Sequence, residues 1–398
     1  MTAVDIAVIG GGIQGVGVAQ AAAAAGYSVL LVEKGQLAAG TSSTSSKLIH
    51  GGLRYLRQGE YRLVRESLRE RDTLLRIAPD LVRANRFHIP VYRHTRLRPW
   101  QLRVGLSLYA LLARRNPLAA LAGLSAAERR ALAGLNQEGL EAVFSYPDAQ
   151  TDDRQLTEAV ARSARQLGAS ILTDTRAVMA RRHRDGYELS TMIRQGREEG
   201  LRVTHCRALV NAAGPWVNQV AAHIAPQPPQ LAVELVKGTH LVLEQQLSAE
   251  CYYLEAPQDG RAVFALPWRG KTLLGTTEVP WHGDPDQVTA SAAEEEYLLT
   301  TLGAYFPDYR RDCRVVGRMA GLRVLPAGGG KPTERSREVQ LVADLHENGG
   351  YVAIYGGKLT GYRLTAQKVI AALRPCLGKR KAVADTARLR LDGDIPPP

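Results

Sequence analysis

The segment IAVIGGGIQG, residues 6–15, contains the first recognisable structural unit of the chain. Its apolar residues lead directly into a turn with the spacing Gly-x-Gly-x-x-Gly. An alanine-rich, helix-forming stretch follows and stops at Gly26, and a second apolar run, 29–32, ends in Glu33. This order of strand, turn, helix, strand and acidic residue predicts a βαβ unit that binds a dinucleotide.

Each glycine of the turn has a separate expected role. Gly10 permits the tight turn, Gly12 lets the backbone approach a pyrophosphate, and Gly15 allows the helix to pack closely on the strand. The pyrophosphate is expected at the N-terminus of the helix that starts near Gln14, where free N–H groups favour negative charge. Glu33 is placed to accept a hydrogen bond from a ribose hydroxyl.

The segment TSSTSSKLIHGGLRYL, residues 41–56, is not explained by the βαβ unit. One interpretation is a surface loop whose hydroxyl side chains cap the helix that follows. A fully solvated loop, however, has no need of the apolar pair Leu48–Ile49 between hydroxyl residues and the pair Gly51–Gly52. We therefore expect this segment to contact a ligand.

Further motifs follow in order along the chain. They are NAAGPW at 211–216, KGTH at 237–240, PW at 267–268, GTT at 275–277, GLR at 321–323 and YGGKLTGYR at 355–363. Together with residues 41–56, they resemble the flavin-dependent, respiratory glycerol-3-phosphate dehydrogenases of the D-amino-acid-oxidase-like flavoprotein superfamily. Two positions depart from the usual family pattern, because Gly361 stands where threonine is common and Glu278 where aspartate is common.

The resemblance implies an α/β fold in which a Rossmann-like FAD-binding domain is interleaved with an antiparallel-sheet substrate domain. We assign residues 1–85, 146–215 and 318–375 to the FAD-binding domain, 86–145 and 216–317 to the substrate domain, and 376–398 to a largely disordered tail. Respiratory members of the family continue into a further C-terminal helical domain. The chain ends soon after Thr360, so we expect a short form without that domain.

Local patterns predict the main elements. Helices are expected at 61–77, 154–167 and 360–373, with Asp152 and Asp153 as N-terminal caps of the second. Strands of a β-meander are expected at 170–173, 187–193 and 201–203, and 208–213 is expected to return to the main sheet. Strands of the substrate sheet are expected at 233–236, 241–243, 262–266 and 272–274.

The resemblance also implies that FAD is bound non-covalently. The glycine-rich turn at 356–360 is expected to direct backbone N–H groups towards the reduced flavin ring. An ordinary glycine loop before a helix is the alternative. The residues expected to bind FAD are Gly10, Gly12, Gln14, Gly15, Glu33, Thr41, Ser42, Ser45, Ser46, Lys47, Leu48, His50, Val178, Ala213, Gly214, Gly356, Gly357, Lys358, Leu359 and Thr360.

The implied reaction is oxidation of sn-glycerol 3-phosphate to dihydroxyacetone phosphate, with hydride passing from C2 to flavin N5 and electrons then passing to a quinone. A phosphate dianion requires clustered cations, and Arg54 and Arg323 are the candidates because glycines precede both. Tyr55 is a candidate hydroxyl for the same site. The alternatives are surface or interface arginines and a tyrosine that packs in the core.

A base is needed for the C2 hydroxyl proton, and the candidates are Lys358, His50 and His240. Burial and nearby cations would lower the pKa of Lys358, whereas a histidine such as His50 could titrate near neutrality without special arrangement. The alternatives are a lysine bonded to flavin carbonyls and a histidine packed on the ring. The sequence does not decide between these candidates.

Two other functions are compatible with the same residues. A related FAD-dependent oxidase or dehydrogenase of an amino or hydroxy acid could bind its carboxylate with Arg54 and Arg323. A non-catalytic flavin-binding protein is suggested by the missing C-terminal domain. The presence of Arg54, Arg323 and Lys358 argues against the second of these.

Composition and charge limit the ligands, the metal sites and the location that can be expected for the protein. The net charge of +12 could attract nucleic acid, anionic lipid or an anionic substrate, but no nucleic-acid-binding module is found. The four cysteines show no paired spacing and the histidines no ligand pattern, so we expect no metal site. No secretory leader and no apolar run long enough to span a bilayer are found, so a cytoplasmic location is expected.

One segment suggests contact with a membrane. The apolar stretch 104–113 has basic flanks at 96–103 and at 114–115. Such a helix could lie in the interface of an anionic membrane, with Trp100 and Tyr109 near the headgroups. A core helix with solvated ends is the alternative. The sequence therefore leaves peripheral attachment to the inner face of the cytoplasmic membrane as one of two interpretations.

Overall fold

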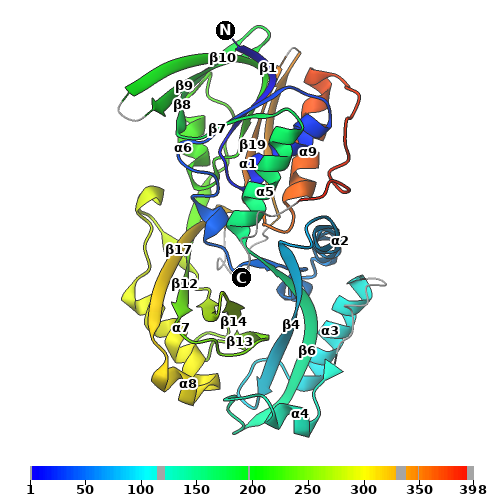
Figure 1. The fold of residues 1–398 in the computed structure, drawn as a ribbon, viewed down its shortest axis with the longest axis vertical. Coiled ribbons are helices and arrows are strands. Elements are labelled where there is room, and N and C mark those ends of the chain that lie inside the picture. Colours follow the sequence, from blue (N-terminus) through cyan, green and yellow to red (C-terminus); the bar gives the residue numbers. More distant parts are fainter. Residues whose placement is uncertain (1, 114–121, 196–197, 329–337, 348, 392–398) are drawn as a thin grey trace.

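Two β-sheets organise the chain in a computed structural model, which describes residues 2–113, 122–195, 198–328, 338–347 and 349–391. Figure 1 shows the two sheets towards opposite ends of the long axis, with several segments running between them. Within the described residues, the first sheet has nine strands and the second has ten. The α/β class and the two-sheet organisation expected from the sequence are confirmed.

The first sheet contains the predicted dinucleotide-binding unit. Its strands are β1 (Thr2–Ile9), β2 (Val29–Val32), β7 (Ser170–Leu172), β8 (Thr175–His183), β9 (Gly186–Gln195), β10 (Glu198–Asn211), β11 (Ile224–Ala225), β18 (Gln340–His346) and β19 (Gly349–Tyr355). They follow the order β11-β8-β9-β10-β1-β2-β7, and β19 pairs with β10 and β18. Strand β1 lies between β10 and β2 and pairs in parallel with both.

The helices of this sheet are α1 (Ile13–Ala24), α5 (Asp153–Gln166), α6 (Val217–Ala221) and α9 (Tyr362–Leu377). Helix α1 is almost entirely buried because its small alanine and glycine side chains let α5 and α9 pack against it. Figure 1 shows α1, α5 and α9 side by side along the sheet. The turn before α1 is therefore held by a close-packed layer of helices.

The second sheet is mainly antiparallel. Its strands are β3 (Leu48–Ile49), β4 (Val82–Tyr92), β5 (Ala122–Gly123), β6 (Leu140–Thr151), β12 (Val233–Leu243), β13 (Cys251–Glu255), β14 (Ala262–Trp268), β15 (Lys271–Gly275), β16 (Val279–Trp281) and β17 (Val315–Pro326). All four strand segments predicted for the substrate sheet lie in it, within β12, β14 and β15. Among the described strands of this sheet, the only parallel pair is β4 with β13.

The remaining helices are α2 (Tyr61–Ile77), α3 (Pro99–Ala113), α4 (Ala126–Arg130), α7 (Ala292–Tyr305) and α8 (Pro307–Asp312). The bounds of α2 match the prediction, because its buried residues recur at helical spacing and Pro79 follows its end. None of the described helices is both long and apolar enough to cross a lipid bilayer.

Sheet membership differs from the expected segments at three places. Residues 170–173 were expected in the meander, but β7 pairs in parallel with β2 at the edge of the first sheet. The meander consists of β8, β9 and β10 instead. Residues from 146 in β6 and from 318 in β17 were assigned to the FAD-binding domain. Both strands belong to the second sheet instead, because β6 pairs along its length with β4 and β17 with β12. The domain boundaries themselves stay a prediction.

The expectation of a largely disordered tail is wrong for residues 376–391. Val383 donates its backbone N–H to the Ala24 carbonyl, and Leu391 donates to the Ile77 carbonyl. The Leu391 side chain is 1% exposed. These contacts with α1 and α2 order the segment, although its own sequence has no clear periodicity. Residues 392–398 lie outside the described part of the chain.

Candidate active site

A large cavity of about 1170 Å³ lies where the two sheets meet. Cavities for single small ligands are typically about 300–1000 Å³, so this one has room for a dinucleotide and a small substrate. Of the residues predicted for the site, the cavity is lined by Gly10, Gly12, Gln14, Glu33, Thr41, Ser42, Ser45, Ser46, Leu48, His50, Arg54, Tyr55, Val178, Ala213, Gly214, His240, Arg323, Gly356, Gly357, Lys358, Leu359 and Thr360. Gly15 and Lys47 are not among the lining residues.

The glycine-rich turn has no room for side chains at two of its positions. Gly10 has a φ of +114°, and a Cβ there would lie 2.6 Å from the Ala212 carbonyl oxygen. A Cβ on Gly15 would lie 1.9 Å from the Gly10 carbonyl oxygen. The turn therefore has the tight backbone and the close helix packing that the sequence predicts.

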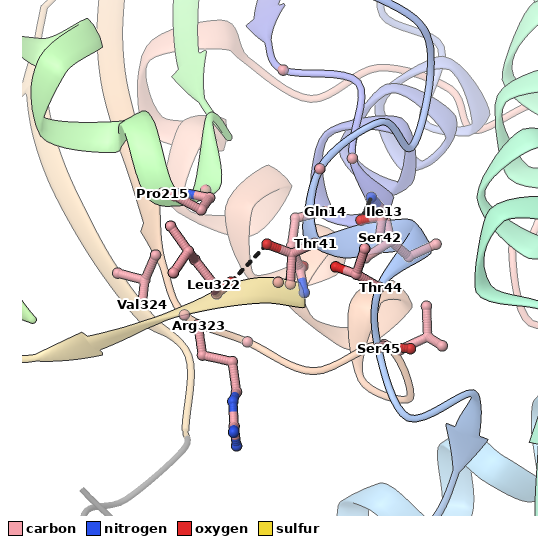
Figure 2. A pocket seen from close by; sticks show the side chains of 18 of the residues that line it. Ile13, Gln14, Thr41, Ser42, Thr44, Ser45, Pro215, Leu322, Arg323 and Val324 are labelled. Atoms are coloured by element: carbon pink, nitrogen blue, oxygen red, sulfur yellow. Dashed lines mark hydrogen bonds between the residues drawn. The ribbon is translucent and has the colours of Figure 1, made fainter. Parts of the chain in front are cut away.

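The hydroxyl-rich segment holds the turn to the second sheet. The Ile13 N–H, at the start of α1, donates to Ser42 Oγ at 2.9 Å. Thr41 Oγ1 donates to the Leu322 carbonyl on β17 at 2.7 Å. Figure 2 shows this bond and, at the next position of β17, the Arg323 side chain extending from the opposite side of the strand. One short segment thus links the nucleotide turn to the strand that carries Arg323.

Glu33 lies at the end of β2, at the edge of the cavity. Its carboxylate accepts the Gly11 N–H at 2.6 Å and the Gly35 N–H at 2.9 Å. These two bonds fix the carboxylate beside the turn. Its predicted contact with a ribose stays a prediction.

The side chain of Lys47 does not reach the cavity as expected. Its ammonium pairs with the buried carboxylate of Asp153, at the start of α5, and donates to the Ser43 carbonyl. Asp153 also accepts the Ser45 N–H and hydroxyl. The expectation that Asp153 caps α5 is wrong, because Asp152 holds the cap by accepting the Gln155 N–H. The ion pair between Lys47 and Asp153, with the bonds to Ser43 and Ser45, instead stabilises the hydroxyl-rich segment.

The features of this end of the cavity fit FAD. A glycine turn at a helix N-terminus suits a pyrophosphate, because backbone N–H groups and the helix dipole favour negative charge. The adjoining wall contains hydroxyl side chains and a fixed carboxylate. Gly356 and Gly357, with φ of +73° and +94°, bring the backbone of the second glycine turn to the cavity wall. The chemistry of this wall therefore fits FAD, and the contacts of the individual residues with the cofactor stay a prediction.

Four charged side chains gather on the opposite wall. Arg323 Nη1 donates to Glu278 Oε1 at 2.8 Å, and Arg54 Nη1 lies 3.7 Å from the same oxygen. Arg261 Nη1 donates to the Glu278 carbonyl at 2.8 Å and lies 3.9 Å from its Oε2. We call Arg54, Arg261, Arg323 and Glu278 the arginine cluster. Such a cluster suits an anion that is partly shielded from water.

Arg261 is not among the residues predicted from the sequence for this site. It precedes β14, and Asp259 accepts its Nε–H at 2.6 Å while Tyr297 donates to the same carboxylate at 2.9 Å. No motif identifies Arg261 in a chain so rich in arginine. The available signal was its position immediately before a strand predicted for the substrate sheet.

Lys358 and Tyr55 meet in the cavity. Lys358 Nζ lies 3.7 Å from the centroid of the Tyr55 ring, a cation–π contact. Gln14 Nε2 donates to the Lys358 carbonyl at 3.3 Å, and the His50 N–H donates to Thr360 Oγ1 at 3.1 Å. Both predicted glycine turns and the segment from His50 to Tyr55 are thus joined at one place.

His240 lies on β12 and is 3% exposed. Its Nε2 is 3.0 Å from Ser46 Oγ. Burial, reinforced by the positive charges of Lys47 and Arg323, lowers the pKa of His240 to about 3. His240 is therefore neutral near pH 7 and is a poor base for an alcohol proton, so its predicted role as the base is not supported.

The chain is similar to known flavoproteins over most of its length. A model of the FAD dependent oxidoreductase family matches residues 5–363. Glycerol-3-phosphate dehydrogenase from Pseudomonas aeruginosa is 40% identical over 377 residues, which cover 93% of this chain and 72% of the relative. D-Erythritol 1-phosphate dehydrogenase from Brucella abortus is 38% identical over 381 residues, covering 93% of this chain and 73% of the relative.

A solved structure agrees with these relatives. Glycerol-3-phosphate dehydrogenase from Bacillus halodurans, complexed with FAD, superimposes with a TM-score of 0.72 at 27% identity and covers 98% of this chain and 67% of that chain. The predicted family and the predicted cofactor, FAD, are thereby confirmed. The chain belongs to the FAD dependent oxidoreductase family, in the group that contains the glycerol-3-phosphate dehydrogenases.

Proposed function

We propose that the protein oxidises sn-glycerol 3-phosphate to dihydroxyacetone phosphate and passes the electrons to a quinone. The observation that carries the proposal is the arginine cluster beside Lys358 and Tyr55 in the cavity that fits FAD. FAD, when bound, accepts a hydride from C2 at N5. The residues of the chain supply the binding, the orientation and the handling of the hydroxyl proton.

Arg54 and Arg323 are proposed to bind the phosphate. Guanidinium groups suit phosphate oxygens because they donate two parallel charge-assisted hydrogen bonds. Both side chains are about one quarter exposed, at 27% and 25%, so a ligand can reach them while most of the surrounding water is excluded. Tyr55 is proposed to add its hydroxyl to the same site.

Lys358 and His50 remain the candidates for the base. Both line the cavity, and both lie on segments joined by the bond from the His50 N–H to Thr360. Substitution of Lys358 by Met should slow flavin reduction by at least about a hundredfold if its amine takes the proton, because general base catalysis typically contributes that much. An unchanged rate of reduction would assign the proton to His50.

Anaerobic bleaching of the flavin by a small substrate panel tests the function. The panel contains sn-glycerol 3-phosphate, glycerol, D-erythritol 1-phosphate, glycine and D-lactate. We expect rapid bleaching by glycerol 3-phosphate and none by glycerol, because glycerol has no phosphate for Arg54 and Arg323. D-Erythritol 1-phosphate is included because a relative of nearly equal identity is named for it. Bleaching by glycine or lactate alone would reject the proposal.

Helix α3 supports attachment to an anionic membrane surface. Trp100, Val104 and Leu111 are 67%, 60% and 71% exposed, and their spacing places them along one face. Tyr109 is not near headgroups as expected, because it is 4% exposed and bonded to Asp148. Arg114 and Arg115 lie outside the described residues. We propose a cytoplasmic protein that attaches to the inner face of the membrane through α3, where a quinone is available.

Flotation with anionic liposomes tests the attachment. The wild type should float at low salt and less at moderate salt, and Trp100→Ala with Leu111→Ala should reduce flotation severalfold. Leu201→Ala is the matched control, because Leu201 is also 63% exposed but lies on β10 in the first sheet. Absence of flotation at either salt concentration would reject attachment. If turnover with oxygen alone is rapid and a quinone analogue does not increase it, the proposal that a quinone is the electron acceptor is rejected.

A further inference from the structure

An ion pair bridges the two sheets at the end of the cavity beside Glu33. Lys34 follows Glu33 just beyond β2 of the first sheet, and its Nζ donates to Asp286 Oδ1 at 2.6 Å. Asp286 lies in a single-turn 3-10 helix, Pro285–Gln287, that follows β16 of the second sheet. Lys34 and Asp286 both line the cavity. Their contact therefore joins the two sheets across one end of the cofactor site.

The same lysine also lies over an aromatic ring. Lys34 Nζ is 3.9 Å from the centroid of the Trp216 ring, a cation–π contact. Trp216 in turn reaches the residue before the hydroxyl-rich segment, because a Cβ on Gly40 would lie 3.4 Å from its Cζ3 atom. Trp216 and Gly40 line the cavity as well. Contacts therefore run without a break from Asp286 to the hydroxyl-rich segment.

The turn that carries Asp286 is held by local hydrogen bonds. The Asp284 side chain accepts the Asp286 N–H at 2.9 Å, and the Asp284 carbonyl accepts the Gln287 N–H at 3.0 Å. Trp281 Nε1 donates to the same carbonyl at 3.3 Å. Lysine, by contrast, carries its charge on a flexible four-carbon chain. Opening of the ion pair therefore requires movement of the Lys34 side chain rather than of the turn.

Trp216 has a hydrogen-bond donor that the protein itself does not use. Its indole Nε1 is buried and has no hydrogen-bond partner among the described residues. A buried donor without a partner is unfavourable, and the ring nitrogens and ribose oxygens of FAD are acceptors that can satisfy it. Glu33, the residue expected at the ribose, is fixed beside the glycine-rich turn. Both features fit the adenosine half of FAD, at the end of the cavity that the ion pair bridges.

The ion pair by itself contributes little to the stability of the fold. The side chains of Lys34 and Asp286 are 41% and 56% exposed. Exposed ion pairs add little to the free energy of unfolding, because water and salt screen their charges. A contact that must break before the cavity opens at this end acts instead on the rate at which a cofactor leaves. The pair is therefore better explained by retention of the cofactor than by folding.

We propose that Lys34, Asp286 and Trp216 form a strap that slows the dissociation of FAD. The Lys34 ammonium binds the Asp286 carboxylate and the Trp216 ring at the same time, and departure of the adenosine half requires both contacts to break. The inference concerns retention of FAD, the cofactor of the family, and is independent of the proposed substrate. It holds even if glycerol 3-phosphate does not bleach the flavin.

The rate of FAD dissociation tests the strap. FAD-loaded protein is diluted, and the rise in fluorescence of the released flavin gives the rate constant. Lys34→Met removes the charge and keeps an unbranched side chain, so release should be about three- to thirtyfold faster, the combined effect of an exposed ion pair and a cation–π contact. Asp286→Asn should give an intermediate rate, because the contact with Trp216 remains. Lys34→Arg keeps both contacts and should stay close to the wild type.

A double-mutant cycle shows whether the two charged residues act through each other. Because Asp286 acts through Lys34, the variant with both Lys34→Met and Asp286→Asn should release FAD no faster than Lys34→Met alone. Moderate salt should accelerate release from the wild type more than from Lys34→Met, since salt screens an exposed ion pair. Rate increases that multiply in the double variant would overturn the inference.

The matched control is Asp308→Asn. Asp308 pairs with Arg311 at 3.1 Å, but this exposed pair lies within α8 and neither residue lines the cavity. The control should release FAD at the wild-type rate, and circular dichroism of the FAD-loaded variants checks their fold. Equal rates for the wild type and Lys34→Met would overturn the inference. If Lys34→Met cannot be loaded with FAD, Asp286→Asn decides, and a wild-type rate in that variant would overturn it.

Discussion

The glycine-rich turn and the arginine cluster are two walls of one cavity, but they are built in different ways. The turn is made by consecutive residues from Gly10 to Gly15, and its shape depends on backbone atoms that contact one another. The cluster brings together Arg54, Arg261, Glu278 and Arg323 from four separate segments, and it depends on side-chain charges. The comparison teaches that a site defined by backbone shape can be recognised in sequence, whereas a site defined by charge requires the fold.

The two walls should also differ in their tolerance of substitution. A backbone atom at 1.9 Å from a new Cβ cannot move without distorting β1 or α1. A guanidinium at the end of a flexible side chain can be removed with less effect on its neighbours. We therefore expect substitutions in the turn to affect folding and substitutions in the cluster to affect substrate affinity.

The largest effect is expected for Gly15→Ala. The new Cβ would clash with the Gly10 carbonyl oxygen, so the free energy of unfolding should fall by about 3 kcal/mol or more. FAD content should fall with it, measured by the ratio of flavin to protein absorbance and by urea unfolding. Gly105→Ala is the control, because its Cβ would meet nothing within 4 Å. Full flavin content in Gly15→Ala would contradict the packing role of Gly15.

The next effect is expected for Arg323→Ala. Loss of a charge-assisted contact to phosphate costs about 1.5–3 kcal/mol, so KM should rise by roughly ten- to a hundredfold while flavin content stays unchanged. Steady-state kinetics and the flavin spectrum check both parts. Arg318→Ala, an exposed residue of the same strand, should change KM less than about twofold. A loss of flavin without a rise in KM would place Arg323 at the cofactor instead.

Tyr109→Phe tests a buried link behind the cluster wall. The Gly51 N–H donates to the Tyr109 hydroxyl at 2.9 Å, and this hydroxyl donates to Asp148, which Arg71 also contacts at 3.0 Å. Removing the hydroxyl leaves buried groups unpaired, which should lower the free energy of unfolding by about 1–3 kcal/mol at pH 8.

The decrease in the free energy of unfolding caused by Tyr109→Phe should depend on pH. Burial raises the pKa of Asp148 to about 6, with Arg71 and Tyr109 acting in the opposite direction. Because the folded state holds this proton more tightly than the unfolded state, Asp148 favours folding below pH 4 and loses that contribution as pH rises through about 6. A protonated Asp148 carries no charge, so it is stabilised less by the hydrogen bond from the Tyr109 hydroxyl than the carboxylate is. The destabilisation caused by Tyr109→Phe should therefore be smaller at pH 5 than at pH 8. Urea unfolding at both values, with exposed Tyr61→Phe as the control, checks the trend.

The smallest effect is expected for the pH profile of His240→Gln. Since the pKa of His240 is about 3, its titration should not contribute to flavin reduction between pH 5 and 9. The rate can change severalfold through the lost contact with Ser46, but the shape of the profile should remain. Rapid-mixing measurements of flavin reduction across this range give the comparison. A pH dependence that disappears in the variant would restore His240 as a candidate base.

Particular residues mark the limit of prediction from sequence. The bounds of α2 and the roles of Gly10 and Gly15 were predicted because each depends on neighbouring residues. Lys47 was assigned to the cofactor, yet its charge is neutralised by Asp153 from a distant segment. Leu391 was expected in a disordered tail, yet it packs beside the end of α2. In both cases the contact that determines where the residue lies is made with a segment far away in the sequence.

The sequence by itself determined the dinucleotide-binding unit, the family and the FAD cofactor, because strand, turn and helix propensities act over a few residues and the motifs recur in order. The tertiary structure decided that Arg261 and Glu278 join Arg54 and Arg323, and that His240 is neutral. The physical reason is distance. Charge interactions and desolvation depend on where β12, β14 and β17 place their side chains in space, and no local pattern of residues encodes that placement.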